Sequence, residues 1–270
     1  MSDSVPQPTG APIKDASTVM LVRDTDTGVE IFLVRRAKSM AFAAGVTVFP
    51  GGGVDPTDAD AELDWAGPSP AWWGERFGVD AKRAQALVCA AVRETFEECG
   101  VLLAGPTADT VVADTAGYHE ARGQLERREL SLSDFLTREK LVLRSDLLRP
   151  WARWITPVIE TRRYDTNFFV ALLPEGQIPD GATTEAAEVM WRTPQAGIQD
   201  WVDGDTMLMP PTFTQLHSLS QFANTTGILA AEPTIQTIEP TLDTSGPKWR
   251  LSFPGEENYY AAGDLPQISR

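Results

Sequence analysis

The sequence predicts an α/β fold, a layered domain built around a mixed β-sheet. Short apolar runs typical of strands recur along the chain, and two helical segments, Ala81 to Cys99 and Pro210 to Ala223, lie between them. The first two apolar runs are joined by a short turn. Strands interleaved with helices are typical of layered α/β domains, whereas strands joined by tight turns pair antiparallel, so the sheet should contain both kinds of pairing.

The N-terminal third carries the strand signals. Thr18 to Arg36 contains the runs VMLV and VEIFLV around DTDTG, which predicts a β-hairpin. Val46 to Phe49 predicts another strand, stopped by Pro50 and the three glycines at 51–53. Residues 1–15 are rich in proline and polar residues and predict a flexible tail, which leaves 16–270 as a single domain.

The remaining elements follow from breakers and periodicity. Residues 55–80 predict an irregular excursion with one short helix around Trp72 to Phe77. The helix from Ala81 should end at Gly100, the residue type favoured just past a helix end. Apolar runs predict four further strands at Trp154 to Ile159, Asn167 to Leu173, Val189 to Arg192 and Trp249 to Phe253.

Charge and cysteine content exclude several classes of protein. The net charge of −15 repels nucleic acid and anionic membranes, so neither is an expected partner, and no apolar stretch is long enough to span a bilayer. Cys89 and Cys99 lie ten residues apart on one predicted helix, about 15 Å along its axis, too far for a disulfide. The presence of only two histidines, His119 and His217, argues against a histidine-rich zinc site. We expect a cytoplasmic protein.

The helix from Ala81 to Cys99 carries the strongest chemical signal. Val88, Val92, Phe96 and Cys99 fall on one face, the predicted core face, and three glutamates cluster on the other, Glu94, Glu97 and Glu98. Carboxylates crowded near the negative end of a helix repel one another and the helix dipole. A hard divalent cation such as Mg²⁺ would relieve that conflict. A solvated acidic face is the competing interpretation.

The surrounding residues resemble the Nudix box, a glycine followed by a loop and then R-E-x-x-E-E-x-G-apolar. Phe49-Pro50-Gly51-Gly52 provides the first part, and the segment from Arg93 to Val101 matches the second at every defined position. The resemblance implies an α/β/α sandwich with a loop-helix-loop metal site. It also implies Mg²⁺- or Mn²⁺-dependent hydrolysis of a nucleoside diphosphate linked to another group. By position, the implied metal ligands are Glu94, Glu97, Glu98 and the box glycine, Gly52.

The resemblance also assigns Arg93 the role of orienting a ligating glutamate. An ordinary ion pair between Arg93 and Glu97, four residues apart, can coexist with that role.

The spacing departs from the family pattern. The box glycine and arginine are normally 14 residues apart, whereas Gly52 and Arg93 are 41 apart. Gln85 stands eight residues before the arginine, where the box has its first glutamate, so Asp55 or Glu62 could substitute only if the loop folds back. The subgroup typified by the peroxisomal coenzyme A diphosphatase has a comparable insertion. We place the insertion at about 56–82 and a C-terminal extension from about 225.

Several further residues are candidates for catalysis or substrate binding. A carboxylate must accept the proton of the attacking water, and the candidates are Glu98 itself, Glu185 and Glu188. Backbone at Gly51 and Gly52, together with four arginines, could hold substrate phosphates: Arg35, Arg36, Arg162 and Arg163. Solvated surface positions are the competing interpretation for two of these arginines.

The leading hypothesis is hydrolysis of a nucleotide-derived diphosphate, with coenzyme A or acyl-coenzyme A favoured by the subgroup likeness. Cleavage of ADP-ribose or a nucleotide sugar, and a noncatalytic nucleotide-sensing module, are the alternatives. Trp65, Trp72 and Trp73 in the insertion could stack a base, but a homodimer contact or a small core is the favoured interpretation.

Overall fold

A long antiparallel hairpin begins the fold of the computed structural model, which describes residues 10–36, 45–59, 62–183, 186–246 and 249–263. Strands β1 (Ile13–Thr25) and β2 (Gly28–Arg36) pair across a two-residue turn, as predicted. Strand β1 starts within the segment predicted to be a tail. Its first residues pair in parallel with a distant strand, and Asp15 forms an ion pair with Arg83, so residues 13–15 belong to the sheet.

The central sheet is mixed, as predicted. Its main path runs β10-β2-β1-β9-β8-β11, with β1 and β9 parallel and most other neighbours antiparallel. The remaining strands are β3 (Thr47–Val48), β4 (Gly51–Gly53), β8 (Leu148–Ile155), β9 (Arg163–Leu172), β10 (Ala186–Arg192) and β11 (Thr237–Ile238). The three glycines were predicted to stop a strand, but they form β4 and pair with β1. At Gly51 a side chain would collide with the backbone of β1 at Ser17 and Thr18, so glycine permits this close approach.

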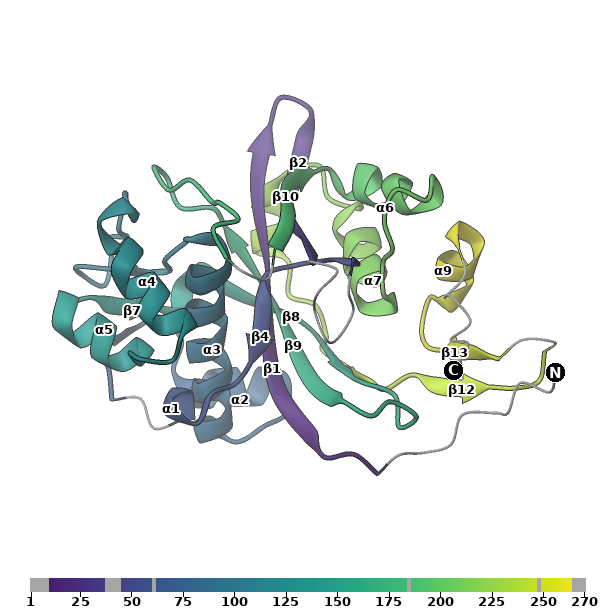
Figure 1. The fold of residues 1–270 in the computed structure, drawn as a ribbon, viewed down its shortest axis with the longest axis horizontal. Helices are drawn as coiled ribbons and strands as arrows, with labels where there is room; N and C mark the ends of the chain where they lie inside the picture. The colour runs from purple at the N-terminus through teal and green to yellow at the C-terminus, as the bar shows by residue number, and fades with distance from the viewer. Residues whose placement is uncertain (1–9, 37–44, 60–61, 184–185, 247–248, 264–270) are drawn as a thin grey trace.

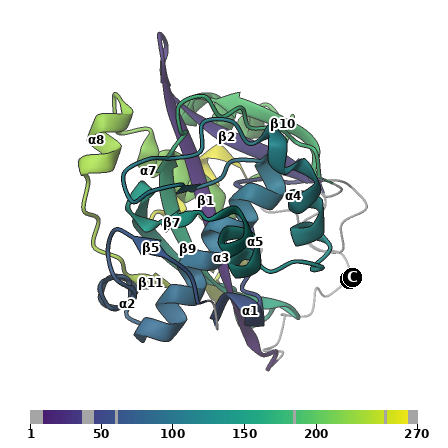
Figure 2. The same cartoon turned by 90° about the vertical axis from the view of Figure 1, so that its left-hand side faces the viewer.

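Helices cover both faces of this sheet, giving an α/β/α sandwich (Figure 1). One face carries α2 (Pro70–Phe77), α3 (Ala81–Cys99), α4 (His119–Glu126) and α5 (Leu132–Glu139), which Figure 2 shows in front of the sheet. The other carries α6 (Pro194–Val202), α7 (Pro210–Leu219), α8 (Thr225–Ala230) and α9 (Glu256–Ala262). Each face of the sheet has its own hydrophobic core, and side chains along β1 alternate between them. Val19 and Leu21 pack in the core under α2 to α5, whereas Met20 and Val22 pack in the core under α6 to α9.

Smaller elements decorate the sandwich. The insertion forms α1 (Pro56–Ala59), β5 (Trp65–Ala66) and the predicted helix α2, whose Trp73 is fully buried against Phe77 and Phe169. Strand β5 joins a separate sheet with β6 (Ala104–Gly105) and β7 (Val142–Arg144). Short 3₁₀ turns occupy Ala116–Tyr118 and Ser145–Leu147, and β12 (Thr241–Asp243) pairs with β13 (Arg250–Ser252). No helix in the described ranges could cross a membrane.

Helix α3 is fixed at both ends, with the predicted bounds. The Asp80 side chain accepts the Arg83 N–H at its start, and Gly100 ends it in the left-handed conformation with φ of 70°. Its middle is held to β1 because the buried Ser17 hydroxyl donates to the Leu87 carbonyl at 2.7 Å. Near its start, Arg83 donates to Asp165 of β9 at 2.7 Å. These contacts set the position of the glutamates two turns further along the helix.

Candidate metal site

The three glutamates of α3 lie against the glycine strand β4. Glu97 and Glu98 are each 9% exposed, and the Glu94 side chain is 13% exposed. The Gly51 N–H donates to a Glu98 carboxylate oxygen at 2.9 Å. A Cβ at Gly52 would lie 2.6 Å from the Glu94 carboxylate, so any larger residue there would displace that carboxylate. The acidic face of the helix is therefore largely enclosed, which argues against the solvated-face interpretation.

Arg93 joins the helix to the loop before it. Its Nη1 donates to Glu94 at 2.8 Å and to Glu97 at 3.3 Å, so the predicted pair with Glu97 is present. Its Nη2 donates to the Gly53 carbonyl at 2.9 Å. One guanidinium thereby fixes two candidate ligands relative to the strand that carries the box glycine.

Asp58, in α1, is a site residue that the sequence analysis missed. It is 1% exposed and accepts from Arg93 Nε at 3.1 Å and Nη2 at 2.9 Å. A signal for it was present: Asp58 is six residues after Gly52, and the usual box spacing also puts its first acid six residues after the glycine. Gln85 is at the position of the first acid only when the spacing is counted back from Arg93. The extra residues therefore follow the first acidic position of the box.

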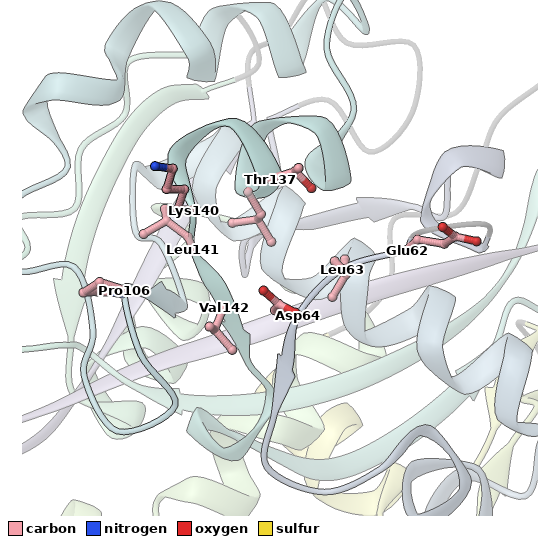
Figure 3. A pocket seen from close by; sticks show the side chains of 9 residues that line it. Glu62, Leu63, Asp64, Pro106, Thr137, Lys140, Leu141 and Val142 are labelled. Carbon is pink, nitrogen blue, oxygen red and sulfur yellow. The ribbon is translucent and has the colours of Figure 1, made fainter.

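The other three residues considered for that position lie elsewhere. Gln85 is in α3, eight residues before Arg93, or about 12 Å along the helix axis. Asp55 borders the site, because its backbone N–H donates to Asp58 at 2.8 Å, while its carboxylate accepts from Thr57. Glu62 lines a cavity of about 480 Å³, on the opposite side from Lys140 (Figure 3). The loop does fold back, but it brings Asp58 to the arginine.

The site carries more negative charge than Arg93 balances. Burial, opposed by Arg93 and aided by the neighbouring Glu94 and Asp58, raises the pKa of Glu97 from 4.5 to about 7. Burial also raises the pKa of Asp58, although Arg93 opposes it. Burial would lower the pKa of Arg93, but Glu94, Asp58 and Glu97 raise it overall, so the guanidinium stays charged.

The donor chemistry fits a hard divalent cation, because carboxylate oxygens are the ligands that Mg²⁺ and Mn²⁺ prefer. A cation would also offset the excess charge that raises the pKa of Glu97. In the part of the chain that the structure describes, no three acidic, histidine or cysteine side chains converge as a ligand set. Glu94 and Glu97 turn toward Arg93, and Glu98 contacts the Gly51 N–H. Cation binding would therefore require these side chains to rotate.

Two other candidates meet at the edge of the sheet. Arg35 of β2 and Glu188 of β10 are cross-strand partners, with Arg35 Nη1 3.1 Å from a Glu188 oxygen. Both keep access to solvent, since 30% of the Arg35 side chain and 54% of the Glu188 side chain are exposed. Arg36 pairs across the strands with Ala186. Glu185 lies outside the described residues.

The remaining arginines lie at the start of β9. Arg163 is buried, donates from Nε to the Thr156 carbonyl at 3.0 Å and pairs with Glu239 at 2.5 Å. Its contacts join β9 to the C-terminal extension, which favours a structural role over phosphate binding. Arg162 is exposed just before the strand.

Comparisons with known proteins agree with this architecture. The family model of the NUDT19 Nudix domain matches residues 81–219, more than half of the chain. The human acyl-coenzyme A diphosphatase NUDT19 is 29% identical over 240 residues, which cover 73% of this chain and 62% of that protein. Its Xenopus laevis counterpart is 24% identical over 229 residues, covering 72% and 60%.

The chain thus spans little more than 60% of the length of these two relatives. The putative nudix hydrolase 7 of Caenorhabditis elegans is 27% identical, with 95% of this chain and 78% of that protein covered. The crystal structure of a NUDIX hydrolase from Alicyclobacillus acidocaldarius superposes with a TM-score of 0.68 at 24% identity, covering 84% of this chain and 99% of that one. That likeness confirms the fold.

Proposed function

Because the chain belongs to the Nudix hydrolase family, we propose that it hydrolyses the diphosphate bond of a nucleotide derivative with Mg²⁺ or Mn²⁺ held by Glu94, Glu97 and Glu98. The observation that carries this proposal is the enclosure of these carboxylates between Arg93 and the glycine strand. Coenzyme A or acyl-coenzyme A is the favoured substrate, since two relatives are named acyl-coenzyme A diphosphatases.

The chain's own residues supply alignment and proton transfer. When bound, the cation offsets the charge of the diphosphate and lowers the pKa of an attacking water. Arg93 holds the Glu94 and Glu97 carboxylates, and Asp58 holds Arg93. The Gly51 N–H donates to a Glu98 carboxylate oxygen, and the Glu98 carboxylate is our candidate acceptor for the water proton. The bare backbone at Gly51 and Gly52 lets the substrate approach closely.

Arg35 and Glu188 are proposed to act at the edge of the same site. A substrate phosphate would compete with Glu188 for the Arg35 guanidinium, whose fork suits phosphate oxygens. Glu188 would then be free to accept a proton in place of Glu98. Arg36, Arg162 and Glu185 remain predictions from the sequence.

A noncatalytic nucleotide-sensing module loses its main support. That alternative rested on Gln85 standing where the box has its first acid. Asp58 is at the position of the first acid when the spacing is counted from Gly52, and it accepts hydrogen bonds from Arg93. This contact supports a catalytic box, because the first acidic position then carries a carboxylate.

The test is a substrate panel with the variant Glu97→Gln. Coenzyme A, an acyl-coenzyme A, ADP-ribose and a nucleotide sugar are incubated with Mg²⁺, with Mn²⁺ or with a chelator, and the products of diphosphate cleavage are quantified. Activity should require the cation and fall about 100-fold or more in Glu97→Gln, because metal-bound charge stabilisation supplies several kcal/mol. Glu120→Gln, at an exposed position on α4, is the matched control.

Parent-like turnover by Glu97→Gln would refute the metal assignment. Preference for ADP-ribose or the nucleotide sugar would replace coenzyme A as the substrate while leaving the metal site intact.

A further inference from the structure

The carbonyl end of α3 is capped by other parts of the chain. The last carbonyls of a helix have no partner within the helix. Here Arg122 of α4 donates from Nε to the Glu97 carbonyl at 2.9 Å, and the Asp180 N–H donates to the Cys99 carbonyl at 3.0 Å. The Thr115 hydroxyl donates to the Gly100 carbonyl at 2.9 Å. The turn that bears two of the proposed metal ligands is therefore held from outside the helix.

Arg122 is built into this position. It is 6% exposed, and its Nη1 contacts both carboxylate oxygens of Asp180, at 2.8 and 2.9 Å. A Cβ at Gly100 would lie 2.9 Å from that nitrogen, so the glycine leaves room for the guanidinium. The positive charge faces the negative end of the helix dipole, where cations are favourable. Asp180 balances this charge close to the acidic cluster.

The loop between β9 and β10 is tied to the same helix end by a second contact. The buried side chain of Gln177 accepts from the Leu102 N–H at 2.8 Å and donates to the Leu102 carbonyl at 3.0 Å. Gln177 and Asp180 lie in the loop that leads to β10, the strand of Glu188. Arg122 thus connects the last turn of α3 to the segment that precedes a candidate base.

We propose that Arg122 is a positioning residue for metal binding: its hydrogen bond to the Glu97 carbonyl and its pair with Asp180 hold the last turn of α3 where Glu97 and Glu98 can ligate a cation. This inference rests on the proposed metal-dependent hydrolase. Partners that hold metal ligands in place are typically worth 10- to 100-fold in metal affinity or activity. Arg122 itself contacts a ligand's backbone, so its effect would pass through the orientation of the Glu97 side chain.

The test measures Mn²⁺ binding to the purified full chain without substrate, by the electron paramagnetic resonance signal of free Mn²⁺. We expect Arg122→Gln to raise the dissociation constant about tenfold or more with unchanged stoichiometry. Where the protein is active, kcat should fall about tenfold or more in saturating substrate, with KM within about twofold of the parent. A purely structural role would instead lower the binding stoichiometry, through loss of folded protein, and leave the dissociation constant unchanged.

Arg122→Lys keeps the charge and serves if the glutamine variant fails to fold. Lysine offers a point charge rather than a planar fork, so it should also weaken Mn²⁺ binding. Arg127→Gln is the matched control, because Arg127 ends the same helix and pairs with Glu129 at an exposed position. It should bind Mn²⁺ as the parent does.

Parent-like dissociation constants in folded Arg122→Gln and Arg122→Lys would overturn the inference. A parent that binds Mn²⁺ but cleaves no diphosphate would instead refute the proposed function, and the comparison of dissociation constants would still test Arg122.

Discussion

Asp58 shows how one buried carboxylate can complete a site from a distant segment. Replacing it by asparagine would remove the charge-assisted hydrogen bonds of Asp58 to Arg93, which would keep Glu94 and Glu97 as partners. We expect Asp58→Asn to lower kcat about 10- to 100-fold and to destabilise the fold by about 1.5 to 3 kcal/mol, measured by steady-state kinetics and urea unfolding. Asp58→Glu should recover part of both losses, since it restores the carboxylate.

Asp64→Asn, an exposed change in the same insertion, should match the parent. If Asp58→Asn kept full activity, Asp58 would not support Arg93.

Glu97 should make the stability of the metal-free protein depend on pH. Its pKa is raised from 4.5 to about 7 in the folded chain, chiefly by burial, so the protonated form stabilises the fold. That contribution is complete below pH 4.5 and is lost as the pH rises through about 7, a fall of about 3 kcal/mol. Urea unfolding in a chelator from pH 5 to 8 should show this fall in the parent but not in Glu97→Gln.

Added Mg²⁺ should restore stability at pH 8, where the carboxylate is ionised. Equal pH dependence in the parent and the variant would contradict this assignment.

The residues of the site were predictable to the extent that their chemistry is local. Glu94, Glu97, Glu98 and Arg93 lie on one helix, so their proximity follows from helical spacing. The contact with Asp58 closes over 35 residues and depends on the fold of the insertion. Arg163 looked suited to phosphate, but its partner Glu239 comes from a segment whose path the sequence did not reveal.

Among the elements, those with strong local signals were predicted best. Helix α3 has the predicted bounds because good helix formers run unbroken from Ala81 to the glycine cap. Strand β8 was expected at Trp154 to Ile159, but it spans Leu148–Ile155. Pro150 lies within this strand, at an irregularity in the pairing with β9, where a missing N–H is tolerated.

The sequence analysis names no element between α3 and β8, a segment that contains α4 and α5. These helices span only eight residues each and bury a narrow apolar stripe, such as Phe135 and Leu136 in α5. Short helices are stabilised mainly by tertiary packing, in this case by the stacking of Phe135 on Phe96 of α3. Arg122, on α4, was hidden from the sequence analysis for the same reason.

At the scale of the whole molecule, the two cores share one sheet and should unfold together. Met20 and Leu21 are adjacent in β1 and fully buried, but they pack in opposite cores. Loss of either core exposes one face of the same strands, so neither layer should survive alone. We therefore expect one cooperative transition, with coincident far-UV and near-UV circular dichroism during urea unfolding.

Met20→Ala and Leu21→Ala test this coupling as a matched pair. Each substitution opens a cavity in one core and should lower the free energy of unfolding by about 2 to 5 kcal/mol. Because both cores include side chains of β1, either substitution should shift the same single transition. Ile178→Ala, at a position 82% exposed, should change stability by less than about 0.5 kcal/mol. Two separable transitions, one shifted by each β1 variant, would show that the layers on the two faces of the sheet fold independently.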